Sequence, residues 1–557
     1  MSSLRSRPPA RPRGTSRVRL LAGAGVVVIA AAIAFGLWRA TSGNDASTVP
    51  VAALPGYTEG LAGAWQRINP LFATTNDVDA DLSSLVFSGL LRIGPDGQVG
   101  PDLADALPDV ADEGRTYTFH LRKGLTWQDG APLTSSDVSF TVKKLVESDF
   151  RGDPALAESW VSVVVETPDP STIVLRLRQP SAPFLARNAT IGILPEHLLG
   201  SLTAAALFEA PYNTAPVGSG PYKIQTIDNR EAVLVANGRY HFGKPAIETM
   251  RIRFYSDYPS AVRAVASGEL QGLVIQDPLT DAQQTELAKI KGIVVAPYER
   301  SAYLVLYLNN DQAAFFEDPH VRRAISLGID RRAIVKAALE GGATASSSAV
   351  APGNWAYRKE YDHTSPDIEA ARKLLADAGW KLPPATGVLT REGQEFRFTI
   401  RTDNDQRRVA VAGEIARQLE QLGIRATVAS TTFSVLRRDF LQTRTYEAAV
   451  AGWDQGADPD PYFGWHSSQL GAGGLNLANF QDVVVDELIG KARTTDDVVV
   501  RKDLYKQFQE KWEALTPSVV IAYPQAFYVH SDTIKGMTQG ILSASSQRFY
   551  DVQKWSQ

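Results

Sequence analysis

YLVLYLN, beginning at Tyr303, and DPHVRRAISLGIDRRAIVKAALEGG, beginning at Asp318, put a strand-like run directly ahead of a helix-like run. The first is rich in the aromatic and apolar residues that are typical of strands. In the second, Asp318 and Pro319 supply an N-terminal cap and a first-turn proline, and Gly341 is a helix-ending glycine. We therefore predict one helix between Asp318 and Gly341.

The same alternation continues toward the C-terminus. SPDIEAARKLLADAGW opens with Ser365 and Pro366, and VAVAGEIARQLEQLG, from Val409, is a further helix followed by strand-like IRATVAS. This alternation predicts an α/β fold after about residue 300, and the earlier half carries more β-sequence. We find no internal repeat and no Pro/Gly-rich linker, so lobes joined by crossing strands are expected. Other strand-like runs are TYTFHL from Thr116, TIVLRLR from Thr172 and FRFTIRT from Phe396.

The charge of the chain is unevenly distributed. Residues 1–40 hold seven arginines and no acid, whereas the rest has 50 basic against 61 acidic residues. Such an acidic body argues against a nucleic-acid partner, which needs a clustered positive surface. The chain has no cysteine, which excludes disulfides, cysteine nucleophiles, thiolate metal sites and a thioether-linked lipid anchor.

The arginines flank an apolar segment. Residues 20–38, LLAGAGVVVIAAAIAFGLW, contain no charge and are close to the roughly 20 residues that cross a bilayer as a helix. We predict a basic cytoplasmic N-terminus (1–19), a single transmembrane anchor (20–38) and a linker (39–56), with the body facing outward. A cleaved signal sequence is the alternative, because such segments also follow basic residues. Export is expected in either case.

No catalytic or metal-binding motif is visible. The seven histidines are scattered and none lies in a metal-binding spacing. There is also no nucleophile elbow, Walker loop or dinucleotide-binding fingerprint. We therefore expect a protein that is not an enzyme, with no catalytic residues, no metal site and no cofactor.

Aromatic and acidic residues gather in one loop-like segment instead. AGWDQGADPDPYFGWHSS, from Ala451, directly follows the apolar run YEAAVAG. Aromatic faces and carboxylates in such a loop suit a pocket for apolar groups and an amine, although capped turns with packed aromatics would look the same. Candidate ligand contacts in it are Trp453, Asp454, Asp458, Tyr462 and Trp465. Trp355, in APGNWAY, is a weaker candidate that can simply pack under a loop.

Several segments together resemble the peptide/nickel class of ABC-transporter substrate-binding proteins, the large dipeptide- and oligopeptide-binding family. They are NPLFATTNDVDADLSSLVFSGLLRIGPDGQVGPDLADALP from Asn69, YTFHLRKGLTWQDGAPLTSSDVSFTVKKL from Tyr117, PVGSGPYKI from Pro216, FEDPHVRRAISLGIDRRAIV from Phe316, AARKLLADAGW, and VDELIGKARTTDD from Val485. The blocks follow one another in order from about residue 57 to the end.

The resemblance implies a two-lobed Venus-flytrap fold of the periplasmic-binding-protein type. Lobe I would span 57–300 and return at 526–557, with an extra subdomain at about 95–210, and lobe II would span 301–525. The protein would be a monomer that captures a small peptide between the lobes and passes it to a permease with cytoplasmic ATPases. Arginines and aspartates in the matching blocks, such as Arg322 and Asp330, would belong to the scaffold.

The resemblance also gives the aromatic loop a role. In peptide-binding members, a tryptophan after Ala-Gly is followed a few residues later by an aspartate that pairs with the peptide's α-ammonium. Here Trp453 fits, but Asp454 follows it at once and Asp458 comes four residues later, so the partner would be Asp454, Asp458 or neither. Non-peptide solutes (a nickel chelate, haem, an oligosaccharide or an opine-like compound) and a membrane-anchored sensor or scaffold without transport remain the alternatives.

Overall fold

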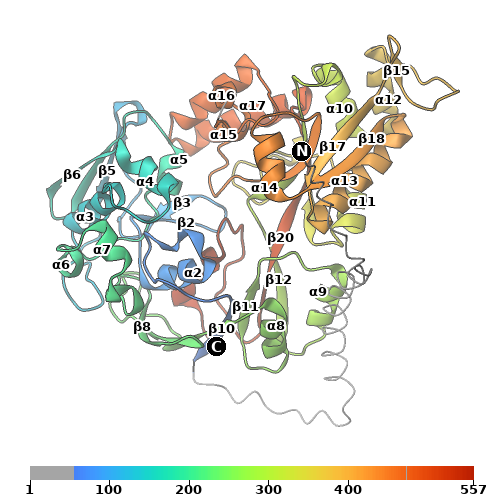
Figure 1. Cartoon of the computed structure of the whole chain (residues 1–557). Helices are drawn as coiled ribbons and strands as arrows, with labels where there is room; N and C mark the ends of the chain where they lie inside the picture. The colour runs from blue at the N-terminus through green and yellow to red at the C-terminus, as the bar shows by residue number, and fades with distance from the viewer. Residues whose placement is uncertain (1–55, 472) are drawn as a thin grey trace, which may run out of the picture.

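The computed structural model describes residues 56–471 and 473–557, which form two lobes connected by shared strands (Figure 1). The strands are β1 (Tyr57–Ala62), β2 (Leu91–Ile93), β3 (Val99–Pro101), β4 (Asp109–Ala111), β5 (Thr116–His120), β6 (Val164–Asp169), β7 (Thr172–Arg176), β8 (Tyr222–Ile227), β9 (Glu231–Ala236), β10 (Thr249–Tyr255), β11 (Gly272–Ile275), β12 (Ile293–Glu299), β13 (Ala302–Leu308), β14 (Ala343–Ala345), β15 (Thr390–Arg391), β16 (Gln394–Glu395), β17 (Arg397–Asp403), β18 (Arg425–Thr431), β19 (Ala448–Asp454) and β20 (Val519–Ser531). The α-helices are α2 (Asp77–Val86), α3 (Ser135–Val146), α4 (Pro154–Val161), α5 (Pro183–Arg187), α6 (Glu196–Leu199), α7 (Ala204–Phe208), α8 (Tyr258–Ala266), α9 (Asp281–Ala288), α10 (Pro319–Leu327), α11 (Arg331–Ala338), α12 (Ile368–Asp377), α13 (Gln406–Leu419), α14 (Phe433–Val435), α15 (Tyr462–Trp465), α16 (Val483–Arg493) and α17 (Val498–Leu515).

β20 belongs to both lobes. Its first part pairs with β13 and β14 in lobe II, and its second part pairs with β11 and β12 in lobe I. The change of lobe falls between Pro524, which pairs with Ala343, and Gln525, which pairs with Glu299. The second crossing is the short link from β12 to β13, at Arg300 and Ser301. Both crossings lie beside the lobe boundaries proposed from the sequence.

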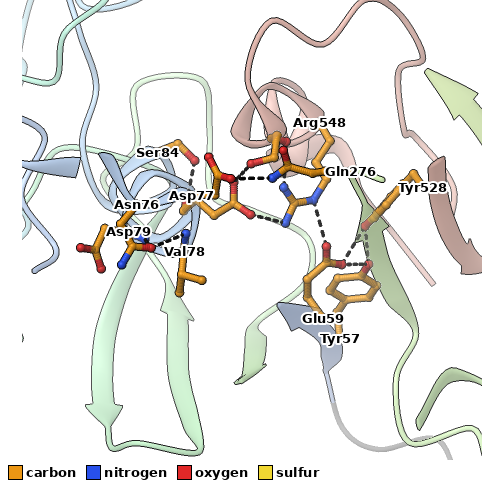
Figure 2. Close-up of polar contacts among 12 residues, drawn as sticks. Tyr57, Glu59, Asn76, Asp77, Val78, Asp79, Ser84, Gln276, Tyr528 and Arg548 are labelled. Carbon is orange, nitrogen blue, oxygen red and sulfur yellow. Dashed lines mark hydrogen bonds and ion pairs between the residues drawn. The ribbon is translucent and has the colours of Figure 1, made fainter. Parts of the chain in front are cut away.

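Lobe I is built on the sheet β11-β1-β10-β9-β8, with β1 parallel to both of its neighbours. The C-terminal segment packs against it through Arg548, whose side chain has no exposed surface. Arg548 forms ion pairs with Glu59 on β1 (2.9 Å) and Asp81 on α2 (2.8 Å). Glu59 also accepts hydrogen bonds from the hydroxyls of Tyr57 (2.5 Å) and Tyr528 (2.8 Å), as Figure 2 shows. One guanidinium thereby joins β1, α2, β20 and the C-terminal segment.

A separate four-stranded antiparallel sheet, β4-β5-β7-β6, lies at one end of lobe I. In Figure 1 it stands at the left, covered by α3 and α4. α3 begins with a capping box, in which Asp137 Oδ2 accepts from the backbone N–H of Thr134 at 2.9 Å. WQDG, from Trp127, forms a tight turn: Gly130 N–H donates to the Trp127 carbonyl at 2.9 Å, and the Trp127 ring is fully buried. This sheet falls inside the range expected for the extra subdomain.

Lobe II is a sheet covered on both faces. β17 pairs in parallel with β18 and β19, and β13 lies between β19 and β20. Along β13, Leu304, Leu306 and Leu308 join one apolar core and Tyr303, Val305 and Tyr307 join the other. This alternation follows from the two-residue period of a strand. Helices α10 to α13 cover the first face, and α16 and α17 cover the second.

The helix predicted between Asp318 and Gly341 is two helices, so that prediction is wrong. Gly328 ends α10, and Asp330 leaves the helical conformation with ψ at 96°. The Asp330 carboxylate accepts from Ala333 N–H at 2.9 Å and caps α11. An internal aspartate can therefore end one helix and begin another, because its side chain competes for backbone N–H groups.

The cap of α12 also differs from the prediction, since Asp367 rather than Ser365 accepts from Ala370 N–H, at 2.9 Å. The strands expected from YLVLYLN, FRFTIRT, TYTFHL, TIVLRLR and IRATVAS are confirmed as β13, β17, β5, β7 and β18. Arg322 is confirmed as a scaffold residue: its buried guanidinium donates to the carbonyls of Leu515 (2.8 Å) and Thr516 (2.9 Å) behind α17.

The predicted membrane anchor, residues 20–38, lies outside the described residues, as do the basic N-terminus and all but the last residue of the linker. Between residues 56 and 557, leaving aside residue 472, no helix is both long and apolar enough to cross a bilayer.

Arg548→Met tests the buried cluster of lobe I. It leaves two buried carboxylates without their cation, which we expect to lower the free energy of unfolding by about 3–5 kcal/mol. Urea unfolding monitored by circular dichroism measures this. The matched control is Lys244→Met, which removes an exposed pair with Glu248 and is expected to cost less than about 1 kcal/mol. Equal losses of unfolding free energy in the two variants would show that the buried cluster contributes no more to stability than an exposed ion pair.

Candidate functional site

A cavity of about 640 Å³ lies where the two lobes meet. Most of its wall comes from lobe I: α2, the segments 87–93 and 190–192, and the C-terminal segment 542–550. Arg300, in the link between the lobes, and Asp454, at the end of β19, complete it. The volume lies within the roughly 300–1,000 Å³ typical of sites for small ligands.

Many hydroxyl groups lie in the wall of this cavity. Serines come from α2 (Ser83 and Ser84) and from the C-terminal segment (Ser543, Ser545 and Ser546). One of them, Ser545, donates to the Asp81 carboxylate at 2.7 Å and so connects the wall to the buried Arg548 cluster. Hydroxyls both donate and accept hydrogen bonds, so this surface suits a hydrated, polar ligand.

Charged side chains of both signs line the cavity. Asp77 is exposed on α2 and accepts from Gln276 Nε2 at 3.0 Å, as Figure 2 shows. Asp102 pairs with His241 at 2.7 Å, with both side chains almost completely buried. Arg92 and Arg300 supply positive charge.

Asp454 is the lobe II carboxylate of the cavity. It is the last residue of β19 and pairs in the sheet with Ala302. Its Oδ1 accepts from the Ser301 hydroxyl and from Gly456 N–H, both at 2.9 Å. The side chain is exposed, and Oδ2 accepts no hydrogen bond from the described residues. Asp454 is therefore oriented by its neighbours while one oxygen still faces solvent.

Trp453 and Trp465 occupy different surroundings. Trp453 is half-buried and packs over Gly464. Trp465 is 1% exposed. Its Nε1 donates to the Tyr303 hydroxyl at 3.1 Å, and its ring lies against Trp512, with 4.5 Å between ring centroids. Trp465 is thus part of the core beneath α17, where no ring face is left for a ligand.

Asp458 forms an ion pair inside lobe II. Its two carboxylate oxygens accept from Arg501 Nη1 at 2.9 Å and Nη2 at 2.8 Å, with both side chains buried. Burial opposes the charge of Arg501, but Asp458 and the Tyr505 hydroxyl hold its pKa above the ordinary value. Trp355 packs against Tyr505 and the Arg501 guanidinium. Asp458 and Trp355 therefore belong to one packed network outside the cavity wall.

The end of the aromatic loop contacts the extra sheet region of lobe I. Tyr462 stacks on Arg493, whose guanidinium carbon lies 3.9 Å from the ring centroid. Burial raises the pKa of neighbouring Asp460, and Arg493 opposes that shift. The Arg493 carbonyl accepts from Ala182 N–H, next to α5, at 2.7 Å. This end of the loop therefore joins the two lobes and does not line the cavity.

Of the six residues predicted as ligand contacts, only Asp454 lines the cavity. The others lie in the core, in the Arg501 network or at the contact between lobes. Sequence reasoning missed the α2 serines and the C-terminal segment. Their residue types are ordinary surface types, and only the fold brings positions 77–92 and 542–550 together. The signal present in the sequence, aromatic and acidic residues in the loop after an apolar run, included Asp454 but did not separate it from the other candidates.

Comparison with known proteins agrees with this architecture. The family model for bacterial extracellular solute-binding proteins, family 5 (middle region), matches residues 98–474. The oligopeptide-binding protein AppA of Bacillus subtilis is 27% identical over 506 residues, which are 89% of this chain and 90% of AppA.

Solved structures have the same fold. AppA in complex with a nonapeptide matches with a TM-score of 0.62 and 25% identity, over 90% of this chain and 98% of AppA. NikZ from Campylobacter jejuni in complex with Ni(L-His) matches with a TM-score of 0.66 and 25% identity, over 90% and 99%. HbpA2 from Haemophilus parasuis reaches a TM-score of 0.77 at 20% identity, over 90% and 99%, a likeness of fold alone.

The fold and the cavity between its lobes define a two-lobed binding protein for a small solute. The chain belongs to the bacterial extracellular solute-binding proteins, family 5, the peptide/nickel family of ABC-transporter receptors. The expected family and the two-lobed fold are confirmed. The family and its member AppA are described as binding proteins rather than enzymes, and the family is described as extracellular.

The two aspartates of the loop are expected to respond differently to the same substitution. Asp458→Asn leaves buried Arg501 without its counter-charge, which costs about 3–5 kcal/mol of unfolding free energy. Asp454→Asn removes an exposed charge and keeps an acceptor oxygen, so the change stays within about 0.5 kcal/mol. Urea unfolding followed by tryptophan fluorescence compares the two. A similar loss in both would mean that Asp454 is a structural residue.

Proposed function

We propose that this protein captures peptides in the cavity between its lobes and delivers them to an ABC permease with cytoplasmic ATPases. The observation that carries the proposal is Asp454, an exposed and oriented carboxylate at the edge of the cavity. A carboxylate with one free oxygen is the natural partner of a peptide's α-ammonium group. The similarity to AppA over most of both chains supports peptides as the ligand class.

The choice between the two aspartates follows from their partners. Asp458 already has a bidentate ion pair with Arg501 in buried surroundings. A ligand amine would have to displace a charged, hydrogen-bonded arginine, which is unfavourable. Asp454 has only neutral donors, the Ser301 hydroxyl and Gly456 N–H. We therefore assign the ammonium contact to Asp454.

Capture follows from the placement of the wall residues on two lobes. A ligand that contacts Asp454 in lobe II and the α2 serines in lobe I interacts with both at once. Such a ligand stabilises the arrangement in which the lobes are close, by its difference in affinity for the two arrangements. The two crossings, at Arg300–Ser301 and at Pro524–Gln525, are where the chain can bend.

A non-peptide solute of the same receptor class is the second candidate, favoured by the similarity to NikZ in complex with Ni(L-His). In residues 56–471 and 473–557, no group of three or more His, Asp or Glu side chains is placed to hold a metal ion. A nickel ligand would therefore have to arrive as a chelate. Haem, an oligosaccharide and an opine-like compound belong to the same alternative, as does a membrane-anchored sensor without transport.

We further propose that the body is held at the outer face of the membrane by residues 20–38 as a single-pass anchor and works as a monomer. The length and lack of charge of that segment support the anchor. The monomer rests on the family resemblance.

Peptide capture is tested by thermal unfolding of the protein with randomised tripeptide to pentapeptide libraries. Ligand at about 100 times its dissociation constant adds about 2.7 kcal/mol of stability, which raises the melting temperature measurably. We expect stabilisation by peptides with a free N-terminus and at least tenfold weaker binding after N-acetylation. In Asp454→Asn, acetylation should make little difference.

Asp77→Asn is the matched control, because it removes another exposed carboxylate of the same cavity without changing its shape. Equal sensitivity of both variants to acetylation would place the ammonium elsewhere. Stabilisation by a nickel–histidine complex, haem or a sugar, with none by peptides, would replace the peptide proposal by the second candidate.

A further inference from the structure

Arg92, like Arg300, lines the cavity without an ion pair to any described residue, and its guanidinium is held in place by neighbouring groups. It is the middle residue of β2 and lines the same cavity as Asp454, from the opposite lobe. The inference below rests on the proposal that this cavity holds the ligand, and adds the chemical class of the ligand's other end.

The guanidinium of Arg92 is held between two aromatic rings. Its central carbon lies 4.1 Å from the ring centroid of Phe242 and 4.0 Å from that of Tyr550. Nη1 also donates to the Tyr550 carbonyl at 3.0 Å. Aromatic faces attract a cation without neutralising it. The rings and the carbonyl thus fix the position of the guanidinium and leave its positive charge available.

Carboxylates near Arg92 do not neutralise its charge. Among the described residues, no Asp or Glu lies within ion-pair distance of it. Asp102, on the same cavity wall, is paired with His241 at 2.7 Å. Arg122 adds further positive charge, since it stacks on Phe242 at 4.8 Å and donates to the Asp102 carbonyl at 2.6 Å.

Arginines that are fully buried have more polar partners than the half-buried Arg92 has. Arg501 and Arg548 have carboxylate partners, and Arg322 donates four hydrogen bonds to main-chain carbonyls. Arg92 makes one hydrogen bond within the described chain, and its Nε is buried without a partner. A guanidinium presents five N–H donors in a rigid fork that matches a carboxylate. Arg92 is therefore an oriented cation without an anion, in the wall of a ligand cavity.

We propose that Arg92 binds a carboxylate of the ligand. With Asp454 as the ammonium partner in lobe II, the cavity selects ligands that carry a positive and a negative group, one for each lobe. For a peptide, the carboxylate is the free C-terminus or an acidic side chain. Because the aromatic rings hold the guanidinium in place before the ligand arrives, little freedom is lost when the carboxylate binds.

The test compares four randomised tripeptide libraries: free, N-acetylated, C-amidated and blocked at both ends, each measured by thermal shift and by native mass spectrometry. Wild-type protein is expected to bind the free library at least tenfold more tightly than the amidated one. Arg92→Gln should remove this difference and keep the response to acetylation. Asp454→Asn should do the reverse. Arg92→Lys, which keeps the charge but loses the fork, should retain part of the preference for a free carboxylate.

The matched control is Arg122→Lys, which alters a guanidinium on the same Phe242 ring outside the cavity wall. It should leave the amidation effect at its wild-type size. The melting temperature of each unliganded variant shows whether it is folded. A preference for peptides with acidic side chains that persists after amidation, and disappears in Arg92→Gln, would identify the side chain as the source of the carboxylate.

The outcomes separate the two proposals. If peptides bind, but neither amidation nor the blocking of acidic side chains weakens their binding, the role of Arg92 is overturned and peptide capture stands. If no library binds, the peptide proposal fails. Succinate and glutarate against their dimethyl esters then provide the second arm. Acid-dependent binding that Arg92→Gln abolishes supports the carboxylate site, and absence of such binding overturns it.

Discussion

The pairing of β20 with strands of both lobes is the constraint on which the rest of the molecule depends. A strand needs partners for its backbone N–H and C=O groups along its whole length, and β20 finds them first in lobe II and then in lobe I. The lobes therefore cannot separate without breaking the sheet. A bend remains possible at Pro524–Gln525, beside the link at Arg300–Ser301, and the cavity between the lobes lies beside this link.

Buried arginines fix the chain segments around that bend relative to one another. Arg548 ties the C-terminal segment to β1 and α2, Arg501 ties α17 to the loop after β19, and Arg322 ties α10 to the chain behind α17. Buried ion pairs contribute less to stability than their contacts suggest, because both charges lose their hydration. In this protein the main effect of these arginines is to fix the positions of the segments that they join. The serine-bearing wall of the cavity stands where Arg548 holds it, through Asp81 and Ser545.

The elements were more predictable than the site. Strand β13 is visible in the sequence as a continuous run of apolar and aromatic residues, and β17 is visible because apolar and polar residues alternate along it. The break between α10 and α11 was not visible in the sequence, because the apolar pattern continues past Asp330, where the break falls. In the aromatic loop, composition identified Asp454 but could not separate it from Asp458. The difference depends on Arg501, 43 residues further along the chain. Arg92 was missed because its importance comes from the two rings that enclose it, both distant in sequence.

The hydrogen bond between Ser301 and Asp454 has a mechanical consequence. When one lobe turns about a pivot, each atom travels in proportion to its distance from the axis. Asp454 is hydrogen-bonded to Ser301 in the link between the lobes, so it would lie close to an axis through that link, whereas groups at the outer edge of either lobe would travel much farther. An amine held by Asp454 would remain in place while the lobes move. The ligand would then bind first beside the pivot, and the lobes would close around a ligand that is already bound.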